Sequence, residues 1–212
     1  MSLFNNQTKR KAMSTEYASL KISLIGDACV GKTTLVNTYT SNKYQPHYTP
    51  TVFELVHTFI NLPLPNNREQ FTNLVFYDCS SMESYRDMRW ITYEKSDLYL
   101  ICFDMNKKQS LLNVVNKWYT EVKLFAGKAK VVLVGLKDVD RNSQTGEKVT
   151  TAMITQAREK MAALSPLYFE ISVRNRKHVT AMVEACTREV ILETAKSTSF
   201  TLMEKLMRRN TV

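Results

Sequence analysis

The stretch GDACVGKTT, residues 26–34, constrains the fold of this 212-residue chain more than any other feature. Gly26, Gly31, Lys32 and Thr33 satisfy the phosphate-loop pattern G-x-x-x-x-G-K-[ST]. A short apolar run precedes the loop and a helical pattern follows to about Ser41, which is the context that the motif requires. Backbone amides of such a loop cradle a phosphate, while the lysine reaches the terminal phosphates and the hydroxyl serves Mg²⁺. We assign nucleotide contact to Ala28, Cys29, Val30, Gly31, Lys32, Thr33 and Thr34.

Strand-like apolar runs alternate with helical patterns along the rest of the chain. The strand candidates are residues 20–25, 53–62, 71–77, 97–104, 129–135 and 166–172. The segment PLPNNREQ (63–70) joins the second candidate to the third and suits a hairpin connection. A helical pattern of about 15 residues follows the fourth candidate. Strands alternating with helices imply crossover connections, so we predict an α/β P-loop NTPase domain with a six-stranded, mostly parallel sheet flanked by helices.

Length and composition favour one domain with tails. We expect the domain over residues 19–196, an N-terminal tail over 1–18, and a C-terminal tail or an extension of the last helix over 197–212. Hydrophobic residues make up 44% of the chain, which is enough for a core. The four cysteines lack metal-ligand spacing and are interpreted as reduced, mostly buried thiols. We expect a cytoplasmic monomer.

The formal charge of +9 raises the question of an acidic partner. The positive residues are spread out, with modest clusters only at 9–11 and 207–210. Peripheral contact of the basic tails with an anionic membrane surface therefore stays an open alternative. Nucleic acid is not an expected partner. No apolar run approaches the roughly 18 residues of a membrane span.

The segment YQPHYTPTVFE (44–54) resembles the switch I effector loop of the Rho family of small GTPases. The offset of 19 residues from Lys32 to Thr51 is also the one that small GTPases use. The segments DLYLICFD (97–104) and VNKWYTEV (115–122) are similar to the same family. The resemblance covers about residues 20–195 and implies a small G-domain.

The resemblance also implies a ligand and a set of site residues. The ligand is GTP or GDP with Mg²⁺, and Thr33, Thr51 and Asp78 are the implied metal residues. Tyr44 would pack against the base, and Tyr48, in the same effector loop as Thr51, is also assigned to nucleotide contact. Effector and regulator proteins, including cytoskeletal regulators, would bind through switch I and switch II. The implied effector residues are Pro50, Val52, Phe53 and Glu54.

The base-reading segment departs from the family pattern. In GLKDVD (135–140), a strict overlay places Val139 where the guanine-binding aspartate belongs. Lys137 can still lie along the base, and either Asp138 or Asp140 reads the base after a shift of one residue, or neither does. EISVRN (170–175) resembles the last base-contacting loop, in which the implied contacts are Ser172, Val173 and Arg174.

Two Rho features are missing at the level of the sequence. The interval from Asp140 to Ser172 is too short for the extra helix that Rho proteins usually carry, which puts Rho-specific partners in doubt. The chain ends RRNTV, without a Cys-a-a-X box, so no prenyl anchor is expected.

The segment YDCSSMESY (77–85) departs at the positions that support hydrolysis. Family members use Asp-x-x-Gly-Gln, but here Ser81 occupies the glycine position and Met82 the glutamine position. The resemblance implies that the amide of this glycine contacts the terminal phosphate, and Ser81 is assigned to nucleotide contact through its own backbone N–H. A thioether donates no hydrogen bond and accepts only weakly, so Met82 cannot orient a water as an amide does. Ala28 also replaces a glycine of the phosphate loop. These departures resemble the hydrolysis-impaired Rnd subgroup.

Three interpretations follow from this pattern. The first is a GTP-binding switch with impaired hydrolysis. The second is an ordinary cycling GTPase, in which Glu83 or Ser80 positions the water. The third is a pseudo-GTPase scaffold that binds nucleotide weakly or not at all.

Overall fold

A computed structural model describes residues 18–41, 51–137, 147–164 and 166–209. Within them, a six-stranded sheet has the order β2-β3-β1-β4-β5-β6. Only the β2–β3 pair is antiparallel, and the other neighbours are parallel. The strands are β1 Ala18–Ile25, β2 Phe53–Leu64, β3 Arg68–Cys79, β4 Leu98–Asp104, β5 Lys130–Lys137 and β6 Leu167–Ser172. The predicted α/β architecture is confirmed.

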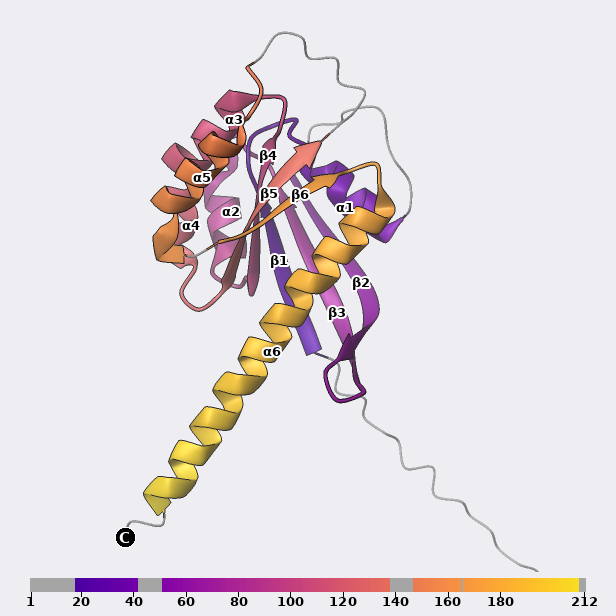
Figure 1. The fold of residues 1–212 in the computed structure, drawn as a ribbon, viewed down its shortest axis with the longest axis vertical. Helices are drawn as coiled ribbons and strands as arrows, with labels where there is room; N and C mark the ends of the chain where they lie inside the picture. The colour runs from indigo at the N-terminus through magenta and orange to yellow at the C-terminus, as the bar shows by residue number, and fades with distance from the viewer. Residues whose placement is uncertain (1–17, 42–50, 138–146, 165, 210–212) are drawn as a thin grey trace, which may run out of the picture.

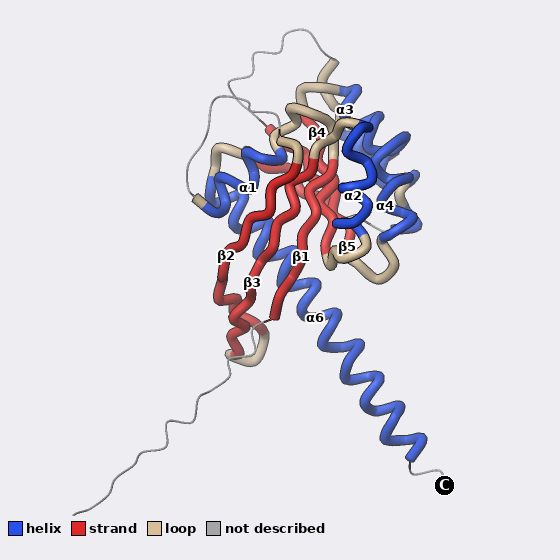
Figure 2. Tube along the Cα trace, turned by 180° about the vertical axis from the view of Figure 1, so that it is seen from behind, coloured by secondary structure: helices blue, strands red, loops and turns tan. Residues whose placement is uncertain are grey.

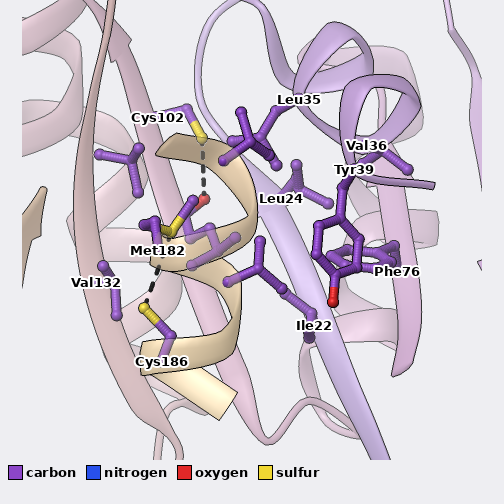
Figure 3. Packing of buried hydrophobic residues seen from close by; sticks show 14 of the residues in the cluster. Ile22, Leu24, Leu35, Val36, Tyr39, Phe76, Cys102, Val132, Met182 and Cys186 are labelled. Atoms are coloured by element: carbon purple, nitrogen blue, oxygen red, sulfur yellow. Dashed lines mark hydrogen bonds between the residues drawn. The ribbon is translucent and has the colours of Figure 1, made fainter. Parts of the chain in front are cut away.

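Helices cover both faces of this sheet (Figures 1 and 2). The first core, part of which is drawn in Figure 3, joins α1 and α6 to one face of the sheet. The second core joins α3, α4 and α5 to the opposite face. The helices are α1 Lys32–Thr40, α2 Arg86–Tyr93, α3 Lys108–Asn113, α4 Tyr119–Phe125, α5 Thr151–Lys160 and α6 Arg176–Arg209.

The β2–β3 connection is shorter than the predicted eight-residue linker 63–70. The turn spans only residues 65–67, and Leu64 pairs with Arg68. Asn66 and Asn67 have φ values of 63° and 55°, a left-handed conformation that asparagine tolerates well. Pro63 lies inside β2, because an edge strand can lose one N–H donor without breaking a ladder on both sides.

The helix predicted after residue 104 contains an irregular turn. A π-helical turn, η2 Val114–Trp118, lies between α3 and α4. Wide turns of this kind are rare and occur frequently at functional sites. They have no local sequence signature comparable to a cap or a proline.

The two ends of the described chain differ. Strand β1 begins at Ala18, inside the range expected for the N-terminal tail. At the other end α6 continues for 34 residues to Arg209 and extends past the edge of the sheet (Figure 1). Among the described helices, none combines the length and the apolar character needed to cross a bilayer.

Candidate functional site

The phosphate loop connects the end of β1 to the start of α1 at the carboxyl edge of the sheet. Gly26 has a φ of 141°, and a Cβ atom there would lie 2.2 Å from the carbonyl oxygen of Cys102 in β4. Gly31 has a φ of 110° at the start of α1. Only glycine adopts these conformations without strain, so both glycines of the motif have a backbone reason to be present.

Lys32 is nearly buried within the loop. Its Nζ donates to the carbonyl oxygens of Gly26 at 2.9 Å and Asp27 at 2.7 Å. Burial lowers the pKa of this amine, and the nearby charge of Asp78 partly offsets that effect. The loop therefore curls around a cation that lies at its centre. Ala28 and Cys29 are exposed on the loop, whereas Val30 belongs to the core.

Three predicted metal residues meet beside this loop, although they lie on separate segments. The Thr33 hydroxyl lies 3.0 Å from the Thr51 hydroxyl and donates to Asp78 Oδ2. Asp78 ends up here because β3 pairs in parallel with β1, which places residue 78 opposite Leu24. Burial raises the pKa of Asp78, and the hydrogen bond from Thr33 partly offsets this.

This oxygen cluster fits Mg²⁺. The second carboxylate oxygen of Asp78 is buried and has no hydrogen-bond partner, which is costly without a compensating ligand. Hydroxyl and carboxylate oxygens are the donors that Mg²⁺ prefers. Thr33, Thr51 and Asp78 are the residues that would hold the ion, directly or through water.

The structure describes only the second half of the predicted effector loop. Val52, Phe53 and Glu54 are exposed at the start of β2, and the Phe53 ring stacks on Tyr77 with centroids 6.3 Å apart. The Ser80 amide donates to Val52 O at 3.0 Å, which ties this loop to the end of β3. Tyr44, Tyr48 and Pro50 lie outside the described residues.

On the base side, the ends of β5 and β6 come together as expected. The Val173 amide donates to Lys137 O, and Val173 O accepts from Thr38 Oγ1 of α1 at 2.8 Å. The Lys137 ammonium forms an ion pair with Glu170. Ser172, the last residue of β6, and Arg174, in the loop that follows it, are partly buried. Asp138 and Asp140 lie outside the described residues, so the base-reading alternatives stay predictions.

The segment after β3 is held from inside the protein. Ser80 is buried and its hydroxyl accepts from the Met82 amide at 3.2 Å. Ser81 is partly buried, whereas the Met82 side chain is 58% exposed. Met82 therefore lies at the surface of this segment with a thioether in place of a hydrogen-bonding group.

A family model described as "Ras family" matches residues 21–192. The chain belongs to the Ras family. This match spans the described domain from β1 into α6, including the phosphate loop and Asp78. Ras-family GTPases bind guanine nucleotides, typically with Mg²⁺, and they interact in general with effectors and regulators.

The similar curated proteins are Rho-related. "Ras-like GTP-binding protein RhoL" of Drosophila melanogaster is 32% identical over 172 residues, covering 81% of this chain and 86% of that protein. "GTP-binding protein rho4" of Schizosaccharomyces pombe is 32% identical over 197 residues, covering 90% and 94%. "Rho-related protein racC" of Entamoeba histolytica is 29% identical over 189 residues, covering 85% and 94%. This Ras-family chain is thus Rho-like.

Sequence reasoning missed several site residues of this Ras-family chain. Asp27 of the phosphate loop accepts from Asn113 Nδ2 and Trp118 Nε1, each at 2.7 Å. Arg89 is 1% exposed and contacts both the segment after β3 and Glu121. Arg89 and Glu121 are 32 residues apart, and Asp27 is 86 and 91 residues from Asn113 and Trp118, so no local spacing indicates these pairs. Helix α2 carries two arginines, Arg86 and Arg89, and the sequence pattern does not indicate which of them is buried.

Proposed function

We propose that this chain is a Rho-like signalling protein that holds GTP with Mg²⁺, hydrolyses it poorly, and acts by recruiting effectors. The observation that carries the proposal is a contrast within one site. Lys32, Thr33, Thr51 and Asp78 converge as a nucleotide and Mg²⁺ site requires, while the adjacent segment presents Ser81 and Met82 where hydrolysis needs glycine and glutamine.

Phosphoryl transfer in this class depends on orienting a water and stabilising charge on the terminal phosphoryl group. When bound, Mg²⁺ neutralises charge on the phosphates. The residues of this chain bind the phosphates: Lys32 offers a cation, and the phosphate loop supplies backbone N–H donors. Met82 offers no amide to orient water. The site therefore supports holding a nucleotide better than cutting it.

The two substitutes considered for the missing glutamine are already engaged. Glu83 lies 3.1 Å from Lys117 Nζ, and a hydrogen bond from that ammonium lowers the pKa of the Glu83 carboxyl. A carboxylate held in this way is a weaker base. The Ser80 hydroxyl is buried and accepts from the Met82 amide. Both contacts favour impaired hydrolysis over ordinary cycling.

The partners that we propose are Rho-type effectors, among them regulators of the actin cytoskeleton. The support is the exposed start of β2, where Val52 and Phe53 are 44% and 39% exposed beside the Mg²⁺ residues. When a protein keeps its GTP, it signals through the effectors that recognise its GTP-bound form. This exposed surface is the one that we propose the effectors bind.

Single-turnover hydrolysis of bound GTP tests the proposal. The unmodified protein should hydrolyse at least about tenfold more slowly than the variant Ala28→Gly/Ser81→Gly/Met82→Gln, which restores the positions that act on the terminal phosphate. Lys32→Ala serves as the control and should lose nucleotide altogether. An unmodified protein that hydrolyses as fast as the triple variant would contradict the proposal.

The nucleotide that co-purifies with the protein separates the alternatives. Chromatography should find GTP. GDP would indicate an ordinary cycling GTPase, and an empty protein that also binds no added nucleotide would indicate a scaffold.

A further inference from the structure

Arg89 of α2 is a buried cation that clamps the segment after β3. Its side chain is 2% exposed. Nη1 donates to Ser80 O at 3.0 Å and to Met82 O at 2.7 Å, while Nη2 donates to Glu121 Oε1 at 3.0 Å. A planar guanidinium can serve both sides at once because its donors point in a fixed fork. One side chain therefore joins α4 to the two carbonyls that flank Ser81.

The charge of Arg89 is supported within the fold. Burial alone would lower its pKa, but the hydrogen bond and charge of Glu121 outweigh burial and raise it. Glu121 also accepts from the Tyr93 hydroxyl at 3.3 Å, so both members of the pair have further partners. A buried pair of this kind leaves one charge uncompensated when either member is removed.

Trp118 connects this clamp to the phosphate loop. Its ring lies 5.3 Å from the Arg89 guanidinium carbon, and its indole N–H donates to Asp27 Oδ1. Asn113 holds the other oxygen of Asp27. Asn113 directly precedes the π-helical turn η2, and Trp118 is its last residue. The phosphate loop and the segment after β3 are thus fastened to the same turn.

Arg89 fixes the direction of the Ser81 N–H as well as the position of the segment after β3. The described chain contains no cis peptide bond. In a trans peptide the C=O of Ser80 and the N–H of Ser81 belong to one plane and point in opposite directions. Arg89 holds Ser80 O, and the Ser80 amide is held by Val52 O at 3.0 Å. The Ser81 N–H is therefore aimed away from Arg89.

We propose that Arg89, held by Glu121 and Trp118, is the positioning residue for the Ser81 N–H and thereby sets a preference for GTP over GDP. This inference rests on the proposed function and on the contact that the family resemblance implies between the amide at position 81 and the terminal phosphate. GDP lacks that phosphate, so loss of the clamp weakens GTP binding and spares GDP binding. The clamp also allows Ser81 to stand where the family has glycine, because Arg89 orients the peptide bond between Ser80 and Ser81 and the backbone freedom of a glycine is then not needed.

The test compares Arg89→Lys with the matched control Arg86→Lys, whose arginine is exposed on the same helix over Trp90. A lysine keeps the charge, but its three donors diverge from a single nitrogen and do not reproduce the planar fork that reaches both carbonyls and Glu121. Arg89→Lys should weaken binding of a non-hydrolysable GTP analogue about tenfold, the value of one charge-assisted hydrogen bond, and leave GDP affinity unchanged. Hydrogen exchange at the amides of residues 80–82 should become faster. Glu121→Gln should shift both measurements in the same direction, and Arg86→Lys should change neither.

If Arg89→Lys weakened the binding of the GTP analogue and of GDP equally, the proposal would be overturned. A purely structural role of Arg89 predicts such an equal loss. Unchanged exchange at residues 80–82 in Arg89→Lys would also overturn it, since the clamp would then hold nothing. If the unmodified protein binds no guanine nucleotide, the proposed function fails and the nucleotide preference fails with it. The exchange measurement, made without nucleotide, would then still show whether Arg89 clamps the segment.

Discussion

The four cysteines differ in their expected thiol reactivity because they occupy different places in the fold. Cys79, Cys102 and Cys186 are buried, and burial raises the pKa of their thiols to about 11, about 12 and about 12. Cys29 is exposed on the phosphate loop, where its φ of 62° turns the backbone. Since the thiolate is the reactive form, accessible cysteines react before buried ones. The predicted set of mostly buried, reduced thiols is consistent with this arrangement.

We expect iodoacetamide at neutral pH to label Cys29 first in the folded protein. GTP or GDP with Mg²⁺ should slow this labelling, because Cys29 lies in the loop that would enclose the phosphates. Mass spectrometry of the alkylated peptides measures both effects, and Cys29→Ser is the control that should abolish the fast reaction. Labelling at the same rate with and without nucleotide would show that the loop does not close on a ligand.

At the scale of elements, β2 is an edge strand that presents aromatic rings to its exposed side. Phe53 stacks on Tyr77 at the start of the strand, and Phe59 stacks on Phe71 near its middle with centroids 5.5 Å apart. The register places Phe53 opposite Cys79, next to Asp78, and Phe59 opposite Asn73. Only the first of these pairs lies beside the nucleotide site.

Phe53→Ala should weaken binding of a Rho-type effector about tenfold or more, as loss of a buried aromatic anchor does at interfaces. Nucleotide retention should stay unchanged, because the Phe53 ring is exposed and stacks on Tyr77, which is not among the proposed nucleotide residues. Phe59→Ala is the matched control and should leave effector binding intact. Isothermal titration with the GTP-analogue-loaded protein measures the binding. Loss of nucleotide from Phe53→Ala would instead assign Phe53 to the support of the site.

At the scale of the whole molecule, the excess positive charge includes both ends of the chain. Residues 1–17 contain three Lys or Arg against one Glu, and residues 197–212 contain the same balance. The basic residues of 197–209 belong to helix α6, whose backbone extends beyond the sheet (Figure 1). We propose peripheral contact with an anionic membrane surface, since each Lys or Arg of a basic segment gains about 1 kcal/mol near such lipids.

Removal of residues 197–212 should reduce co-sedimentation with phosphatidylserine-containing vesicles while nucleotide binding remains. Removal of residues 1–17 takes away the same net charge and shows whether charge alone decides. Binding should weaken with added salt because screening shortens the reach of the lipid charge. Equal binding to neutral phosphatidylcholine vesicles would exclude this electrostatic attachment.

The sequence by itself determined the elements and the phosphate loop. Residues 26–34 form a contiguous motif, and the apolar runs place the six strands within a few residues of their observed bounds. These signals are local: strand and helix periodicities extend over one element, and the loop needs only the residues between β1 and α1. The β2–β3 turn was misjudged locally, because an edge strand accepts Pro63.

Tertiary structure alone decided which distant groups meet. Asp27 and Trp118 are 91 residues apart, and Arg89 and Glu121 are 32 apart. The family resemblance named Thr33 and Asp78 as a pair, but it named neither of these. Their contacts depend on strand order, the π-helical turn and the burial of Arg89, none of which leaves a periodic trace in the chain. A buried polar contact is specified by packing from several elements at once, so its partners become visible only when those elements are assembled.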